Sequence, residues 1–500
     1  MDSVEKQDIN RSAWTTLVIL SCLGLITMYG ETMVLPAIPD FIRDFNISYS
    51  TSSWILSSYL IAGAVMTPIA GKLSDIYGKK KILLIVMAVY SSGILAGGFA
   101  NSIEFMLAAR AAQGVGMSMF PIAFGIIRDV FPEKKLAVAQ SVFSSTFSGG
   151  AVVGLLVGAT IVQNFGWQAT FFSIFPVAVV LALIITRFIR IRKLPIELIM
   201  KAAEESENAA KASSIDLKGA LALAATIISF LAGLTYLESS FESSDFEAAV
   251  FFAAAAVSLA VFIAVEKRTD TPLIDFKLMT DKRLLPATII LMMVFLCMFM
   301  VYQTIPIMVT SPQPLGFGGD ALVTASVQLP FMIVLLIGTI MSGFILNRIG
   351  NIRVTVIGTI ISAIGFFTLL LFHSTEFMVS VTLAIISAGI SFSITGGFNI
   401  VLVSTPIRMT GIALGMTLLL NLVGMSIGPS FAAIYQQMYQ GIVEGVAGQF
   451  PTPDAYNLTF LTAALISGAS VVLALSLSRR RKNIPANVSE GTFSKANVES

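Results

Sequence analysis

Long apolar stretches separated by short polar segments recur along the whole chain. A helix that crosses a membrane needs about 20 mostly apolar residues. Stretches of that length occur fourteen times, at residues 14–38, 51–70, 81–100, 104–127, 137–162, 167–188, 217–237, 247–265, 285–309, 321–346, 353–373, 376–403, 410–437 and 458–478. The pattern therefore predicts an all-α integral membrane protein with fourteen transmembrane helices.

One polar segment between two of these stretches has a second, degenerate copy. GKLSDIYGKKK begins at Gly71, and GFILNRIGNIR begins at Gly343, 272 residues later. The glycines Gly71 and Gly78 of the first copy coincide with Gly343 and Gly350 of the second. We expect a charged loop whose glycines let the backbone turn tightly. Repetition at this distance is typical of transporters built from two similar bundles.

This repeat divides the chain into four parts. We expect a six-helix bundle at 1–190, a second one at 284–482, and a disordered cytoplasmic tail at 483–500. The intervening residues 191–283 are predicted to form a charged cytoplasmic linker and two additional transmembrane helices.

Composition and charge support the membrane assignment. Hydrophobic residues make up 56% of the chain and charged residues 12%, whereas soluble domains usually carry about 25% charged residues. If the N-terminus lies inside, 29 of the 31 Lys and Arg residues fall on the inner side, the exceptions being Arg43 and Arg110. Inner loops of membrane proteins carry such an excess. We therefore expect a multi-pass plasma-membrane protein with both termini in the cytoplasm.

Few residues of this chain are suited to metal, redox or ATP chemistry. The two cysteines, Cys22 and Cys297, lie within apolar stretches, and His373 is the single histidine. We expect no metal site, no cofactor and no catalytic residues, and no GxxxxGK[ST] phosphate-binding loop is visible. The expected partners are a small-molecule substrate, protons and the lipid bilayer, with no nucleic acid, and the protein is expected to be a monomer.

Several motifs resemble those of the major facilitator superfamily. Its signature loop between the second and third helices is similar to the segment with Gly71, Asp75, Gly78, Lys79, Lys80 and Lys81. LAARAAQGVG, which contains Arg110 and Gln113, resembles the fourth-helix motif of proton-coupled members. The fifth-helix antiporter motif resembles the segment with Gly150, Gly154 and Gly158, although Leu155 replaces its expected proline.

Two further stretches resemble the branch with fourteen helices. TMVLPAIP, from Thr32, and GWQATFF, from Gly166, look like signatures of the drug:proton antiporters of that branch. The resemblance implies that Asp75 secures one half against the other when the inner side is closed. Arg128 is a candidate partner for Asp75. The alternative is that this loop only fixes the topology, its lysines facing anionic lipid headgroups.

Arg110 is the most informative single residue, because a charge within a span is costly and usually faces a cavity or a partner. We propose that Arg110 and Gln113 form a polar cluster that responds to protonation of Glu31. Burial favours the neutral acid, and a nearby guanidinium favours the carboxylate. The alternatives are that Arg110 reaches the outer headgroups and that Glu31 faces lipid, since related sequences usually place the acid at the position of Gly30.

Small residues one turn apart occur at corresponding places in the two halves. The predicted helix-bending residues are Gly150, Gly154, Gly158, Gly424, Gly428 and Pro429. Such spacing allows close helix packing, so the alternative role is static packing. The candidate substrate contacts are Tyr29, Met300, Tyr302, Gln303, Gln328, Asn399 and Asn421.

These features together predict a secondary transporter that exports amphipathic drugs or other small organic compounds by alternating access, driven by proton entry. The alternatives are a proton-coupled or facilitative carrier of a defined metabolite, which the missing proline at Leu155 keeps open, and a membrane sensor or channel. An intramembrane enzyme would need paired acids or a metal motif, and neither is visible.

Overall fold

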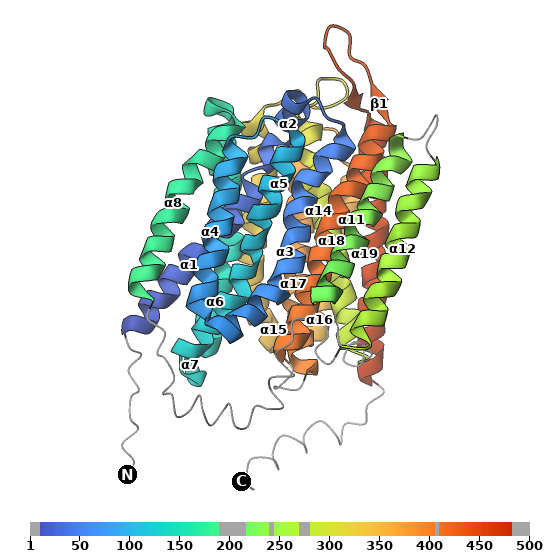
Figure 1. The fold of residues 1–500 in the computed structure, drawn as a ribbon. Coiled ribbons are helices and arrows are strands. Elements are labelled where there is room, and N and C mark those ends of the chain that lie inside the picture. Colours follow the sequence, from blue (N-terminus) through green and yellow to red (C-terminus); the bar gives the residue numbers. More distant parts are fainter. Residues whose placement is uncertain (1–10, 190–216, 240–244, 270–280, 406–409, 483–500) are drawn as a thin grey trace, which may run out of the picture.

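The computed structural model describes residues 11–189, 217–239, 245–269, 281–405 and 410–482. Long helices run roughly side by side through almost all of this part of the chain (Figure 1). The predicted linker before the two additional helices and the predicted tail at 483–500 lie outside the described residues.

The helices of the first half are α1 (Arg11–Thr32), α3 (Tyr49–Tyr77), α4 (Lys79–Gly98), α5 (Ile103–Gly114), α6 (Met119–Val130), α7 (Glu133–Phe165) and α8 (Trp167–Phe188). The short elements η1 (Leu35–Ala37) and α2 (Ile38–Phe45) follow α1, and η2 (Val115–Ser118) joins α5 to α6. The next two helices are α11 (Leu217–Ser239) and α12 (Asp245–Glu266). The second half contains α14 (Leu284–Thr310), α15 (Ala321–Ile349), α16 (Asn351–Leu371), α17 (Glu376–Ser404), α18 (Thr410–Met438), β1 (Gln440–Gly441), β2 (Phe450–Pro451) and α19 (Pro453–Lys482).

Each of the fourteen expected spans falls on helical structure. Twelve helices in the described part are long and apolar enough to cross a membrane. The remaining two expected spans correspond to α11, whose shorter apolar stretch is Lys218–Gly233, and to the consecutive helices α5 and α6. The span expected at 104–127 is helical along its length, with a 3₁₀ segment at Val115–Ser118 between α5 and α6.

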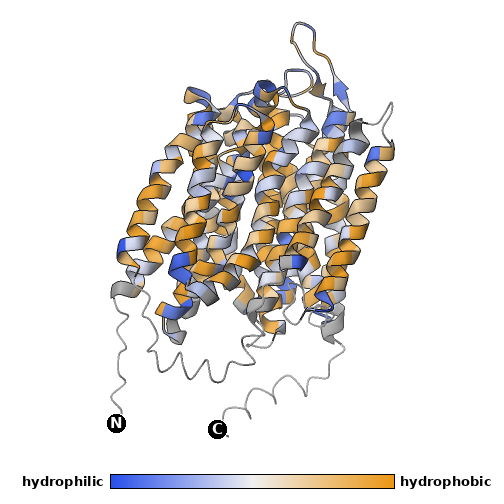
Figure 2. Cartoon of the chain, in the orientation of Figure 1, coloured by the Kyte–Doolittle hydropathy of each residue, from blue (hydrophilic) through white to orange (hydrophobic). Residues whose placement is uncertain are grey.

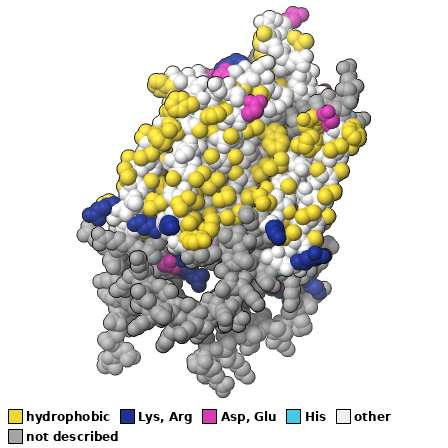
Figure 3. Space-filling model, in the orientation of Figure 1, with side chains coloured by type: hydrophobic (Ala, Val, Ile, Leu, Met, Phe, Trp, Pro, Cys, Tyr) yellow, Lys and Arg dark blue, Asp and Glu magenta, His cyan; other side chains and the backbone are white. Residues whose placement is uncertain are grey.

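The two ends of the helix bundle differ in charge. One end, here called the hairpin end, carries the antiparallel pair β1–β2 (Figure 1). The opposite end, here called the basic end, carries Lys79–Lys81 at the start of α4 and Arg348 at the end of α15. Apolar residues cover the helices between these ends (Figure 2). On the face shown in Figure 3, Lys and Arg side chains gather at the lower border of the apolar surface. This distribution is the one that a membrane-spanning protein needs.

We expected the charged segment that begins at Gly71 to be a loop framed by two glycines, and this expectation was wrong. Helix α3 continues through Gly71 to Tyr77, and the chain turns only at Gly78, whose φ is 96°. The second copy behaves in the same way, since α15 ends at Ile349 and Gly350 has a φ of 88°. Positive φ values suit glycine, which has no Cβ, so Gly78 and Gly350 are the turn residues.

The two halves pack their glycine-rich helices in the same way. In the first half α7 lies against α1, and a Cβ on Gly154 would meet the Tyr29 carbonyl oxygen at 2.8 Å. In the second half α18 lies against α14, and a Cβ on Gly428 would meet the Leu296 carbonyl oxygen at 2.5 Å. Gly150, Gly158 and Gly424 make equally close approaches to backbone. The repeat seen in the sequence is therefore also a repeat of helix contacts.

Contacts between the halves run along two pairs of helices, α3 with α18 and α7 with α15. Hydrogen bonds that join the halves lie near the hairpin end. Ser57 Oγ donates to the Ser426 carbonyl oxygen at 2.7 Å, and Tyr49 N donates to Gln437 Oε1 at 3.1 Å. Tyr49 Oη also donates to the Gln449 carbonyl oxygen between β1 and β2 at 3.1 Å. The hairpin end is therefore closed by direct contact between the two halves.

Candidate functional site

Arg110 lies fully buried in the middle of α5. Its Nε donates to the carbonyl oxygen of Ile55 in α3, and its Nη1 donates to the carbonyl oxygen of Gly30 in α1, both at 3.1 Å. Nη1 also donates to Gln113 Oε1 at 2.8 Å. Gln113 Nε2 in turn donates to the carbonyl oxygen of Gly93 in α4 at 2.9 Å. One guanidinium and one amide thus connect α1, α3, α4 and α5, and Arg110 does not reach for outer headgroups.

Close packing makes this arrangement possible. A Cβ on Gly114 would collide with the backbone carbonyl of Tyr59, so glycine is needed where α5 crosses α3. This approach places the Tyr59 ring beneath the Arg110 guanidinium, with 4.4 Å between the guanidinium carbon and the ring centroid. An aromatic face attracts a cation, most strongly where water is excluded. Tyr59 is a partner that the sequence reasoning missed.

Glu31 is buried beside this cluster, with 3% of its surface exposed. Its Oε2 and the Nη2 of Arg110 are both buried, and neither has a hydrogen-bond partner among the described residues. No N···O distance of 4.0 Å or less joins the two side chains, so they form no direct ion pair. The interpretation that Glu31 faces lipid is therefore wrong, and its attraction to Arg110 acts across a gap.

The position of Gly30 explains why the acid is found one residue later. A Cβ on Gly30 would collide with the hydroxyl group of Tyr90, which itself donates to the carbonyl oxygen of Ile26 at 3.0 Å. A carboxylate side chain has no room there. The short helix η1, which begins four residues after Glu31, contacts α14 and α15, so Glu31 lies near the interface between the halves.

The lysines that follow Gly78 bind neighbouring helices. Lys79 Nζ lies 2.6 Å from Asp129 Oδ2 and donates to the Gly125 carbonyl oxygen of α6 at 3.2 Å. Lys80 Nζ donates to the carbonyl oxygen of Thr186 in the last turn of α8 at 2.8 Å, where the helix dipole favours a cation. The lysines of this segment were expected to face anionic lipid headgroups; in the structure Lys79 and Lys80 bind neighbouring helices.

The pairing of Asp75 with Arg128 stays a prediction. The backbone of Asp75 lies in the last turn of α3, and its side chain lies outside the described part. Arg128 is exposed near the end of α6, and Lys79 binds the adjacent Asp129. The ion pair that the structure describes at this end of the bundle is that of Lys79 with Asp129.

Polar residues of the second half are buried along α14, α15 and α18. Gln303 Nε2 donates to Ser52 Oγ of α3 at 2.9 Å, and its Oε1 has no partner within the described chain. Gln328 and Asn421 are each 2% exposed, and neither amide has a described hydrogen-bond partner. Gln436 is also buried, and its amide has no described hydrogen-bond partner. The sequence reasoning missed this residue, which lies at the end of an apolar stretch.

The other predicted substrate contacts are spread along the bundle. Met300 and Tyr302 are buried in α14, and Tyr302 Oη donates to Met332 Sδ of α15 at 3.6 Å. Tyr29 is half-buried in α1. Asn399 is half-buried near the basic end of α17, one to two turns from its last residue, Ser404. Asn399 is therefore separated from the residues near Tyr302.

Residues suited to metal chemistry do not come together in the described ranges, where no three His, Cys, Asp or Glu side chains could hold one ion. Cys22 and Cys297 are both free thiols.

Several known proteins with similar sequences are named for multidrug resistance or multidrug efflux. The chain is 26% identical over 429 residues to the multidrug resistance protein Stp of Mycobacterium tuberculosis, covering 84% of this chain and 75% of that protein. It is 25% identical over 473 residues to the multidrug efflux pump LfrA of Mycolicibacterium smegmatis, covering 92% and 88%. The match to multidrug resistance protein 3 of Bacillus subtilis, at 26% identity, covers 71% of this chain and 66% of that protein.

Solved structures of transporters share the fold. The D-xylose-proton symporter superimposes with a TM-score of 0.62 and 12% identity, covering 93% of this chain and 97% of the symporter. A point mutant of the nucleoside transporter NupG superimposes with a TM-score of 0.61 and 14% identity, covering 93% and 99%. Residues 20–429 match the family described as Major Facilitator Superfamily. The chain therefore belongs to the major facilitator superfamily, and it is a multi-span membrane transporter and not an enzyme.

Proposed function

We propose that this transporter exports amphipathic drugs or related small organic compounds from the cytoplasm across the plasma membrane, and that proton entry drives the export. The observation that carries the proposal is the burial of Glu31 beside Arg110, with one oxygen and one nitrogen atom left without described partners. A buried carboxyl that faces a cation without binding it can change protonation state without unfolding its surroundings. The names of the similar proteins support the substrate class.

Glu31 would be the proton carrier in this cycle. Protonation removes the attraction between Glu31 and Arg110, while the three hydrogen bonds of Arg110 to Ile55, Gly30 and Gln113 hold the guanidinium in place. Since α1 contacts α7 and is followed by η1, which contacts α14 and α15, a change at Glu31 acts directly on the interface between the halves. The carboxyl would accept its proton from outside and release it inside.

The closed hairpin end fits one state of an alternating-access cycle. We propose that both termini are cytoplasmic, that the hairpin end is therefore the outer side, and that residues 1–190 and 284–482 rock as two bundles. The contacts of Tyr49 with Gln437 and Gln449 would break when the outer side opens. In the opposite state, Asp75 and Arg128 would help to close the inner side, and Gly150, Gly154, Gly158, Gly424, Gly428 and Pro429 would accommodate helix bending.

Substrate would contact the second half mainly through neutral groups. Gln303, Gln328 and Asn421 offer amide donors and acceptors that no described residue satisfies, and burying such groups unpaired is costly. Met300 and Tyr302 add polarizable and aromatic surface close by. These residues suit a monomeric carrier of apolar molecules with several hydrogen-bonding atoms.

Dye export from inverted membrane vesicles tests the proposal. With an imposed proton gradient, wild-type vesicles should accumulate the dye, and Glu31→Gln vesicles should not, although both proteins insert to the same level. Glu104→Gln is the matched control, because Glu104 is exposed at the start of α5. Proton-driven accumulation by Glu31→Gln at the wild-type rate would remove Glu31 from the mechanism.

A further inference from the structure

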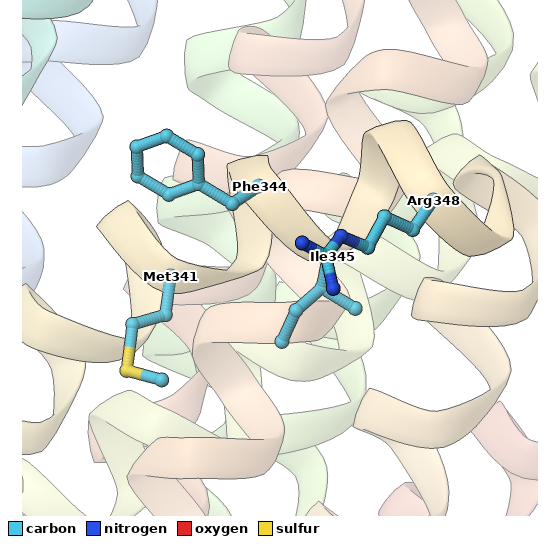
Figure 4. A pocket seen from close by; sticks show the side chains of 4 residues that line it. All are labelled: Met341, Phe344, Ile345 and Arg348. Carbon is cyan, nitrogen blue, oxygen red and sulfur yellow. The ribbon is translucent and has the colours of Figure 1, made fainter.

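A pocket of about 450 Å³ lies on the side of α15 near the basic end of the bundle. Its described lining consists of Met341, Phe344, Ile345 and Arg348 (Figure 4). Spacings of three, one and three residues place these side chains on one side of a helix. The pocket therefore combines three apolar side chains with one cation.

The exposed side of α15 indicates that this pocket faces the bilayer. Phe344 and Met341 are 71% and 53% exposed, and Ile337 and Ile333 continue the exposed apolar row toward the hairpin end, at 50% and 40%. Leu322, the second residue of α15, lies on the same side of the helix and is 42% exposed, so the row stays exposed up to the hairpin end. Because the two halves are in contact at that end, this side of α15 does not face the space between them. In a membrane such a row contacts lipid.

Arg348 lies at the depth of the lipid headgroups. It is one residue from the end of α15 at Ile349, and Met341 lies seven residues deeper, about 10 Å along a helix with a 1.5 Å rise per residue. In Figure 4 the Arg348 side chain runs from its backbone toward Ile345, on the side of the helix that carries the apolar lining residues. A headgroup at Arg348 would therefore have its acyl chain beside Phe344 and Met341.

Within the described residues, no acidic side chain binds Arg348. No Asp or Glu of the described chain lies within 4.0 Å of it, although three other ion pairs are present. Arg348 is exposed, in contrast to Lys79, whose charge is bound by Asp129. A planar guanidinium binds phosphate oxygens through two parallel hydrogen bonds.

We propose that this pocket binds an anionic phospholipid, with the phosphate at Arg348 and one acyl chain along Ile345, Phe344 and Met341. Anionic lipids are concentrated in the cytoplasmic leaflet, which is the leaflet at the basic end if both termini are cytoplasmic. Helix α15 also contacts α7 of the other half. The lipid would thus bind a helix that takes part in the contact between the halves.

Photo-crosslinking of lipid to the full-length protein tests this site. The protein is placed in phosphatidylcholine nanodiscs with a small fraction of photoactivatable phosphatidylglycerol, and the peptide that contains residues 341–348 is analysed by mass spectrometry. Arg348→Gln should lower labelling of that peptide about fivefold, the contribution of one basic residue at an anionic surface. The matched control Arg353→Gln removes an exposed arginine at the start of the neighbouring α16 and should label as the wild type does.

Two further arms distinguish a bound phospholipid from a bound free anion and from ordinary surrounding lipid. Ile345→Trp fills the pocket and keeps the cation, so it should also reduce labelling; unchanged labelling would mean that no acyl chain enters. Soluble glycerol phosphate should not compete, and competition as strong as that of phosphatidylglycerol would identify a site for the anion alone. Equal labelling by phosphatidylcholine and phosphatidylglycerol analogues, unaffected by Arg348→Gln, would show ordinary surrounding lipid and overturn the proposal.

Discussion

Arg110 Nη1 donates a hydrogen bond to the carbonyl oxygen of Gly30, the residue directly before Glu31, at a distance of 3.1 Å. The cation is thus attached to the backbone of the helix that carries the acid, and not to the acid itself. Its second terminal nitrogen, Nη2, and Glu31 Oε2 have no hydrogen-bond partner among the described residues. This relationship allows the carboxyl to titrate while the guanidinium remains anchored.

Arg110 should be important for stability as well as for transport. Arg110→Met removes the donors for Ile55, Gly30 and Gln113, and each buried acceptor left unpaired costs about 1–3 kcal/mol. We expect the midpoint of thermal unfolding in detergent to fall clearly. Arg348→Met, at an exposed position, should change stability by no more than about 0.5 kcal/mol. Equal unfolding midpoints for the two variants would contradict the anchoring role.

Glycines at helix contacts should tolerate substitution according to the space beside them. A Cβ on Gly154 would collide with Thr32, whereas a Cβ on the neighbouring Gly149 would meet its nearest atom, in Leu25, at 3.5 Å. Gly154→Ala should therefore destabilise the protein by about 1–3 kcal/mol, and Gly149→Ala should have little effect. The midpoints of thermal unfolding of the two variants test this expectation. A midpoint for Gly149→Ala as low as that of Gly154→Ala, or lower, would contradict it.

Gly71 should matter for the transport cycle more than for folding. A Cβ at this position meets no atom within 4 Å, and the same holds for Gly468 in α19. Because α3 packs along α18 of the other half, we expect Gly71→Leu to obstruct closure at the basic end and to lower export, with an unchanged unfolding midpoint. Gly468→Leu is the control. If both variants export dye at the wild-type rate, the open space beside Gly71 is not used in the cycle.

Two buried glutamines should respond oppositely to the same substitution. Gln113 uses its amide for hydrogen bonds to Arg110 and Gly93, so Gln113→Leu should destabilise the protein by about 1–3 kcal/mol. Gln328 has no described partner, so Gln328→Leu should leave stability unchanged or raise it. Export of hydrogen-bonding substrates should nevertheless weaken in Gln328→Leu. Substrate affinity and thermal unfolding, measured on both variants, test this contrast.

Tyr49 should hold the hairpin end closed. Tyr49→Phe removes the hydrogen bond from its hydroxyl group to the Gln449 carbonyl oxygen, worth about 0.5–1.5 kcal/mol, and retains the ring. Hydrogen exchange at residues 440–451 should accelerate about two- to tenfold, as this energy implies. Tyr439→Phe is a suitable control, since this tyrosine is exposed beside the same hairpin. Unchanged exchange in Tyr49→Phe would mean that other contacts close this end.

The helices were predictable because the bilayer imposes a length and a composition on each span. The same physics identified Arg110, whose charge is too costly within a span unless buried partners surround it. The helix contacts of Gly154 and Gly428 followed from the small-residue spacing. Each of these inferences needs only a short stretch of sequence and one physical rule.

The remaining features depend on contacts between residues far apart in the chain. The pairing of Lys79 with Asp129 was not predictable, because nothing in the sequence brings α4 and α6 together at that point. Likewise, only the hydroxyl group of Tyr90 explains why Gly30 carries no side chain. Helix α3 extends past its apolar stretch to Tyr77 because helical hydrogen bonding continues where hydropathy falls. Apolar patterns therefore locate the membrane-spanning stretches, but they do not locate the ends of the helices.

Proton movement coupled to substrate is the most direct test of the proposed mechanism. Purified protein is reconstituted into vesicles that contain a pH-sensitive dye, with no gradient imposed, and substrate is added on one side. The wild type should move protons against the direction of the substrate, and Glu31→Gln should move substrate down its gradient without moving protons. Substrate-dependent proton movement by Glu31→Gln equal to that of the wild type would contradict the assignment of coupling to Glu31.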